Sequence, residues 1–157
     1  MLRSLIFGWP PLMWPILASL MIWSSVVDIE RMEIPDMASL ALCITGVLFC
    51  YLDSHDIITH LLAAVIWAGL FCGVGLGYNR WRGWDGLGFG DVKLIAGLAL
   101  WLGFADTTQA VFAAALAGII VVLIGSSRSG RSFSDIGQTA VAFGPFLCLS
   151  AWVTWLF

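Results

Sequence analysis

The feature that most constrains the fold of this chain is its series of long apolar stretches. Most of them approach the ~20 residues that a helix needs to cross a bilayer, and only short polar segments separate them. Backbone polar groups cannot stay unpaired in hydrocarbon, so stretches of this kind should be helices. The sequence predicts six spans: Leu12–Val27, Met37–Leu52, Ile57–Tyr78, Val92–Phe104, Thr108–Gly125 and Ile136–Phe157.

Composition leads to the same fold class. Of the 157 residues, 61% are hydrophobic and 11% are charged, which is more apolar surface than a soluble domain of this length can bury. We therefore expect an all-α integral membrane protein, a bundle of about six transmembrane helices in a single domain over residues 1–157. The apolar run after Arg3 is similar to a secretory signal, but it contains Trp14 and Pro15 and lacks a small-x-small cleavage site, so an uncleaved first span is expected.

The charged and cysteine residues argue against several function classes. The net charge is −3 and the seven basic residues are scattered, so no basic stripe is available to follow a nucleic acid, and none is expected as a partner. The cysteines lie inside apolar runs without a CxxC pair: Cys43, Cys50, Cys72 and Cys148. This pattern is typical of small packing residues rather than of a zinc site or a disulfide framework, so no metal is predicted.

The basic residues also predict the orientation. Six of the seven fall on one side of a six-span bundle: Arg31, Arg80, Arg82, Lys93, Arg128 and Arg131. Short loops that are rich in Lys and Arg stay in the cytoplasm, so this side is predicted to be cytoplasmic. The connections Asp28–Asp36 and Tyr78–Asp91 are both expected on that face.

Two aspartates stand at the ends of predicted spans. Asp28 directly follows the apolar residues of the first span, and a solvated helix end would explain it. Asp91 ends a glycine-rich segment at the start of the fourth span, where an aspartate is also a common helix N-cap. The glycines before Asp91 leave room for an extended polypeptide to lie against the loop.

Taken together, two carboxyl groups from different helices at one membrane face are what aspartyl proteolysis requires. One carboxylate must be ionised to take a proton from water, while its partner is protonated and polarises the peptide carbonyl. An ion-coupled transporter is the alternative function for Asp28 and Asp91, and a structural subunit of a secretion machine is a third. Transport would favour polar residues through the middle of the spans, and these are almost purely apolar.

At this point the chain resembles the type IV prepilin peptidase family of GxGD membrane aspartyl proteases. The first signature is Asp28–Asp36, which ends in Ile-Pro-Asp, and the second is Arg80–Leu94, which contains Gly88-Phe-Gly-Asp91. A weaker third signature is Phe143–Leu147, which contains Phe-Gly-Pro. The resemblance implies that Asp28 and Asp91 are the catalytic residues and that Gly88 and Gly90 frame Asp91 beside the substrate.

The resemblance carries further expectations. Lys93 could orient the substrate or act on the aspartate by its charge, or simply extend from a helix end to solvent. Asp85 stands where many members have Glu. The N-terminal methyltransferase insert of larger members is missing, which implies a peptidase-only form like those of Flp or Tad pili. The implied partner is a type IV prepilin or pseudopilin precursor, cleaved without a cofactor at the cytoplasmic face of the inner membrane, where lipid surrounds the enzyme.

Two other features are interpreted as structural. Gly69, Gly73 and Gly77 form a small-xxx-small row in the third span, which is typical of close helix packing. His60 has no nucleophile paired with it in the sequence and is expected to be a hydrogen-bonded histidine of the interior or of the membrane interface.

Overall fold

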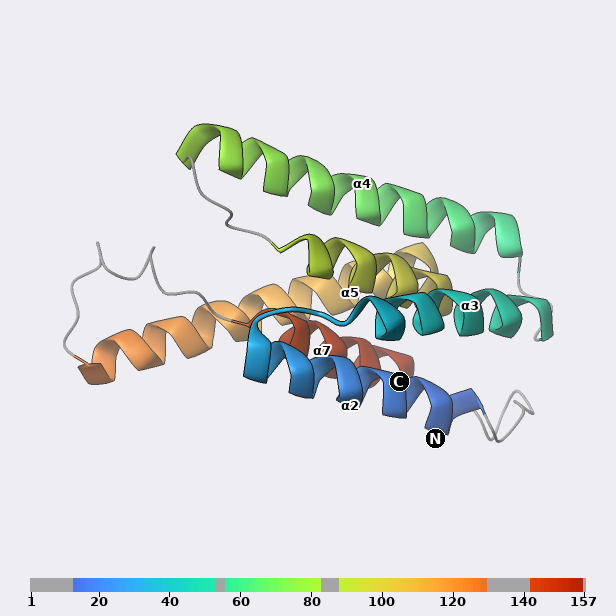
Figure 1. Ribbon diagram of the computed structural model, residues 1–157, viewed down its shortest axis with the longest axis horizontal. Helices are drawn as coiled ribbons and strands as arrows, with labels where there is room; N and C mark the ends of the chain where they lie inside the picture. Colours follow the sequence, from blue (N-terminus) through green and yellow to red (C-terminus); the bar gives the residue numbers. More distant parts are fainter. Residues whose placement is uncertain (1–12, 53–55, 83–87, 130–141, 157) are drawn as a thin grey trace.

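The computed structural model describes residues 13–52, 56–82, 88–129 and 142–156, and these residues form apolar helices with short connections (Figure 1). The helices are α2 (Met13–Arg31), α3 (Asp36–Leu52), α4 (Ile57–Arg82), α5 (Phe89–Ser129) and α7 (Gly144–Leu156). The described residues include no strand. The predicted all-α membrane class is confirmed.

The predicted number of spans is not confirmed. Three helices, α2, α4 and α5, are long and apolar enough to cross a membrane, whereas α3 and α7 are shorter apolar helices. Of the last predicted span, residues 136–141 and Phe157 lie outside the described residues, and α7 occupies most of the remainder.

The fourth and fifth predicted spans both lie in α5, which is interrupted at Gly103. Gly103 has φ 73° and ψ −175°, a conformation that glycine adopts without the clash a Cβ atom would cause. Beyond Gly103 the chain turns back toward the end of the molecule at which α5 began (Figure 1). The sequence analysis predicted two separate helices with a gap at residues 105–107, so it expected a break here but placed it slightly too late.

His60 stabilises the interruption of α5. Its Nδ1 lies 2.8 Å from the carbonyl oxygen of Leu100, to which the thiol of Cys50 also donates at 3.3 Å. A carbonyl only accepts hydrogen bonds, so His60 carries a proton on Nδ1 in this contact. The prediction that His60 is hydrogen-bonded is confirmed, and its side chain is part-buried.

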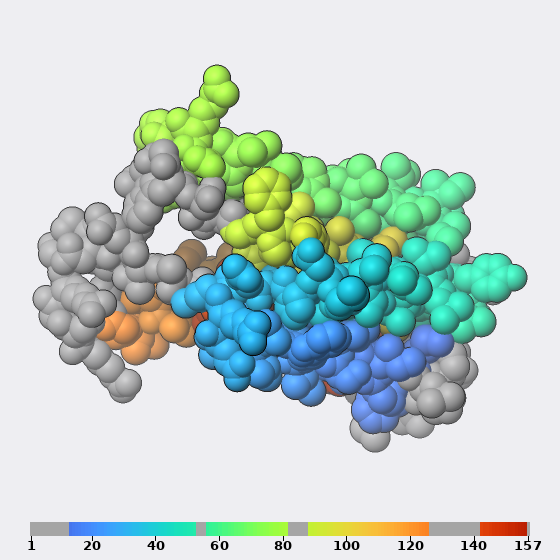
Figure 2. Space-filling model, viewed as in Figure 1, coloured from blue at the N-terminus to red at the C-terminus, as the bar shows by residue number. Residues whose placement is uncertain are grey.

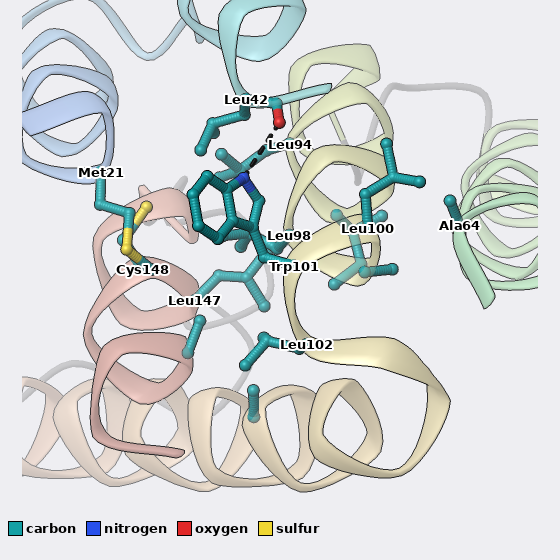
Figure 3. Packing of buried hydrophobic residues seen from close by; sticks show 14 of the residues in the cluster. Met21, Leu42, Ala64, Leu94, Leu98, Leu100, Trp101, Leu102, Leu147 and Cys148 are labelled. Atoms are coloured by element: carbon teal, nitrogen blue, oxygen red, sulfur yellow. Dashed lines mark hydrogen bonds between the residues drawn. The ribbon is translucent and has the colours of Figure 1, made fainter. Parts of the chain in front are cut away.

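Part of the core lies where α3 packs against the first half of α5 (Figure 3). Trp101 stacks on Phe49 with ring centroids 4.8 Å apart, and its indole N–H donates to the carbonyl of Leu42 at 3.1 Å. Glycines make this approach possible, because a Cβ atom at Gly46 or at Gly97 would lie 2.8 Å from a side chain of the facing helix.

The predicted packing role of Gly69, Gly73 and Gly77 is wrong for the part of the chain that the structure describes. A Cβ atom at any of the three positions would meet no described atom within 4 Å. The buried face of α4 is a different one, which contains Ala63, Ala64, Trp67 and Phe71. The glycine row faces outward because larger side chains make the contact with α5.

The connections that carry the signatures gather at one end of the bundle. The C-terminal end of α2 and the first turns of α3, α5 and α7 all lie at this end (Figure 1). The predicted placement of Asp28 and Asp91 at the same face of the bundle is confirmed.

Candidate active site

Asp28 lies in the last turn of α2 and is only 5% exposed. Its Oδ2 accepts a hydrogen bond of 3.0 Å from the backbone N–H of Gly144, the first residue of α7. The first amides of a helix have no partner within the helix, so this contact satisfies a buried carboxyl group and an unbonded amide together. The interpretation of Asp28 as a solvated helix end is therefore wrong.

Gly144 fits this position because it has no side chain. A Cβ atom there would lie 2.6 Å from Oδ2 of Asp28 and 3.1 Å from its Cγ. Pro145 follows in the first turn of α7, where its missing N–H costs no helical hydrogen bond. The third signature thus holds the aspartate of the first signature.

Asp91 is the third residue of α5 and is 9% exposed. Its N–H donates to the carbonyl of Gly88 at 3.0 Å, which closes the glycine turn before the helix. Because α5 begins at Phe89, Asp91 lies in the first turn rather than at the N-cap. Asp28 and Asp91 are close enough for their charges to interact, and the thiol of Cys148, one turn into α7, lies within electrostatic range of both.

The two glycines of the second signature have different surroundings. A Cβ atom at Gly90 would lie 3.0 Å from Cβ of Ile34 and 3.2 Å from its backbone nitrogen, so Gly90 packs against the first signature. Gly88 is exposed, and a Cβ atom there would lie 3.8 Å from Oδ2 of Asp91, which is an ordinary contact. Of the two, Gly88 leaves space beside Asp91 for another molecule.

Lys93 forms an ion pair with Asp36, with Nζ and Oδ1 2.6 Å apart. Both side chains are at least half exposed, so the pair adds little to stability. It links the end of the first signature to the first turns of α5. Asp85 and the other residues from 83 to 87 lie outside the described part of the chain.

The sequence interpretation missed three residues that shape this site. Gly144 donates a hydrogen bond to Asp28. Ile34 packs against Gly90, and Asp36 forms an ion pair with Lys93. All three lie inside the signatures, so the motifs contained the signal. Their roles depend on contacts between segments far apart in the chain.

Comparison with known proteins bears directly on these signatures. Residues 15–123 match the model of the type IV leader peptidase family. The chain belongs to this family. The resemblance inferred from the motifs is thereby confirmed, and the third signature lies beyond the matched residues.

Relatives with curated descriptions support the same family assignment. The chain is 28% identical to a prepilin leader peptidase/N-methyltransferase of Neisseria gonorrhoeae over 94% of this chain and 49% of that protein. It is 34% identical to one from Burkholderia pseudomallei over 85% of this chain and 42% of that protein. It is 31% identical to the leader peptidase HopD of Escherichia coli over 80% of each.

The chain thus spans about half the length of the first two relatives. No solved structure is significantly similar to it.

Proposed function

We propose that this protein is a membrane aspartyl endopeptidase that removes the leader from type IV prepilin-like precursors, with Asp28 and Asp91 as the catalytic pair. The observation that carries the proposal is that two buried aspartates from different helices lie within electrostatic range of each other, at the end of the bundle where three signature segments converge. A buried carboxyl pair with room beside it has the groups that peptide hydrolysis needs.

In this mechanism the two carboxyl groups share the work of acid and base. One takes a proton from the attacking water while the other, protonated, donates a hydrogen bond to the peptide carbonyl. The Gly144 amide orients Asp28, and exposed Gly88 lets the substrate backbone approach Asp91. Burial strengthens these interactions, because water no longer competes for the same groups.

The relatives favour the peptidase reaction over methyl transfer. The region shared with the two bifunctional relatives is about half of each, whereas the chain covers 80% of a relative named only as a leader peptidase. Membership of a peptidase family disfavours the transporter alternative. We propose that the site lies at the cytoplasmic face of the inner membrane, because the six-span prediction puts six of the seven basic residues on that side.

Co-expression with a prepilin-like precursor tests the proposal. The precursor should lose its leader, which is read from its intact mass and from the sequence of its new N-terminus. Cells that carry an empty vector control for host peptidases. If no precursor changes mass while the protein is present in the membrane, the proposed function is wrong.

A further inference from the structure

The first signature contacts α5 on both sides of Asp91. Ile34, in the connection between α2 and α3, is 7% exposed, and a Cβ atom at Gly90 would lie only 3.0 Å from its Cβ. At the start of α3, the carboxylate of Asp36 pairs with the ammonium group of Lys93 at 2.6 Å. Gly90 directly precedes Asp91, and Lys93 is the second residue after it. Asp91 therefore lies between an apolar contact and an ion pair, and both come from one short segment.

The other end of this segment is fixed to Asp28. Met32, the first residue after α2, donates its N–H to the carbonyl oxygen of Asp28 at 2.9 Å. It has φ 55°, the left-handed conformation in which helices commonly end. Only residues 32–35 separate α2 from α3. The two aspartates are thus joined through a short connection as well as through the packing of the helices.

The ion pair is suited to placing groups rather than to holding the fold together. The side chains of Lys93 and Asp36 are 50% and 77% exposed, and exposed pairs add little to stability. Reaction rates respond much more sharply to position, because a displacement of about 1 Å can slow a reaction on the order of a hundredfold. A contact two residues from Asp91 can therefore affect the reaction without affecting unfolding.

We propose that Asp36 and Lys93 are positioning residues, whose ion pair sets the place of Asp91 relative to Asp28. The inference rests on the proposed function and deepens it, because it assigns a role in the reaction to two residues that do not themselves react. A direct contact between Lys93 and the substrate is one competing explanation. A purely local role of Asp36 at the start of α3, where the helix dipole favours a negative charge, is another.

Kinetics of purified variants test the pair. Asp36→Asn and Lys93→Gln each remove one charge and should each lower kcat for precursor cleavage by about twofold to fivefold, the range that the energy of an exposed ion pair allows. KM should change little, since neither residue is proposed to bind the substrate. Asp36→Lys combined with Lys93→Asp restores opposite charges, so its kcat should exceed that of either single reversal.

The control is Glu33→Gln, which removes an exposed carboxylate from the same connection and should leave kcat unchanged. Thermal unfolding in the same detergent should give nearly equal midpoints for the two neutral variants and the unaltered enzyme. Added salt screens an exposed ion pair. It should therefore lower kcat of the unaltered enzyme more than kcat of the Asp36→Asn variant.

Four results would overturn the inference. The first is an unchanged kcat in both neutral variants. The second is a higher KM for Lys93→Gln alone, which assigns Lys93 to the substrate. The third is a loss of kcat that is matched by a lower unfolding midpoint, which assigns the pair to folding. The fourth is a double reversal that is no more active than either single one.

Failure of the proposed function would look different. In that case the unaltered enzyme would not cleave the precursor at all, and the positioning role would fall with the function. An unaltered enzyme that cleaves, with neutral variants that cleave equally fast, would refute only the positioning role.

Discussion

At the scale of single residues, the site depends on one hydrogen bond between distant parts of the chain. Asp28 and Gly144 lie 116 positions apart and meet at 3.0 Å. Burying a carboxyl group costs free energy unless a partner replaces water, and the unbonded amide at the start of α7 is that partner. Asp28 is therefore both held in place and kept out of bulk solvent.

Asp28→Asn and Asp91→Asn should each abolish cleavage. Asparagine has nearly the same shape but cannot exchange a proton, and loss of acid–base catalysis alone costs on the order of 10²–10⁴-fold in rate. Precursor mass after co-expression measures the effect, and immunoblots of the membrane fraction control for protein level. Substantial processing by either variant at a normal level would refute the two-aspartate mechanism.

Gly144→Ala should lower kcat by on the order of tenfold to a hundredfold, because the new Cβ displaces the Asp28 carboxyl from its reacting position. The ideal Cβ lies 2.6 Å from Oδ2, so one of the two groups must move. KM should change little. Gly118→Ala is the control, since a Cβ there meets no described atom within 4 Å. A similar loss of kcat in both variants would argue against a positioning role for Gly144.

At the scale of helices, two sets of glycines inside the spans behave differently. Gly46 and Gly97 let α3 and the first half of α5 approach closely, whereas Gly69, Gly73 and Gly77 face outward from α4. Spacing along the sequence pointed to the outward row, because a small-xxx-small pattern describes a helix surface without identifying its partner. Helix packing therefore depends on which face the large buried side chains select.

Gly97→Ala should destabilise the protein by about 1–3 kcal/mol, the usual cost of overpacking. Its Cβ would lie 2.8 Å from Cβ of Leu42 and 3.5 Å from the backbone oxygen of Ser39, neither of which moves easily. Gly73→Ala should be neutral or slightly stabilising, because alanine favours the helix by about 0.5–1 kcal/mol. Thermal unfolding of the purified protein in detergent measures both. Equal destabilisation would mean that the glycine row does pack against a helix.

At the scale of the whole molecule, the order of the helices brings the signatures to one end of the bundle (Figure 1). On the face seen in Figure 2, the start of α5 (yellow-green) lies against α3, and α3 lies against α2. α3 has 17 residues, about 25 Å at the usual helical rise, against a hydrocarbon core of about 30 Å. A short helix still spans when the bilayer thins around it or flanking residues extend to the interface. The proposed function requires this crossing, because α3 and α4 must both cross if the chain is to return to the side of Asp28 before Asp91 in α5.

Cysteines at the two ends of α3 should be labelled from opposite sides of the membrane. Glu33→Cys, beside the site, should react with an impermeant maleimide only from the cytoplasm, and Tyr51→Cys only from the other side. Both side chains are exposed, and permeabilised cells serve as the control. Labelling of both from one side would show that α3 does not cross. If Glu33→Cys reacts only from the outer side and Tyr51→Cys only from the cytoplasm, α3 still crosses the membrane, but the site lies outside the cytoplasm.

The sequence by itself determined the class of the protein and singled out Asp28 and Asp91 as the candidate pair. Long apolar stretches allow only helices in hydrocarbon, and the motifs around Asp28 and Asp91 are read from consecutive residues. The sequence also indicated a break near Gly103, although it placed the gap at residues 105–107. Only the tertiary structure decided that Asp28 is buried against Gly144, that Gly90 packs on Ile34, and that the glycine row of α4 faces outward. These contacts join residues from different helices, and a local pattern specifies which residues form a helix but not which face of it meets a neighbour.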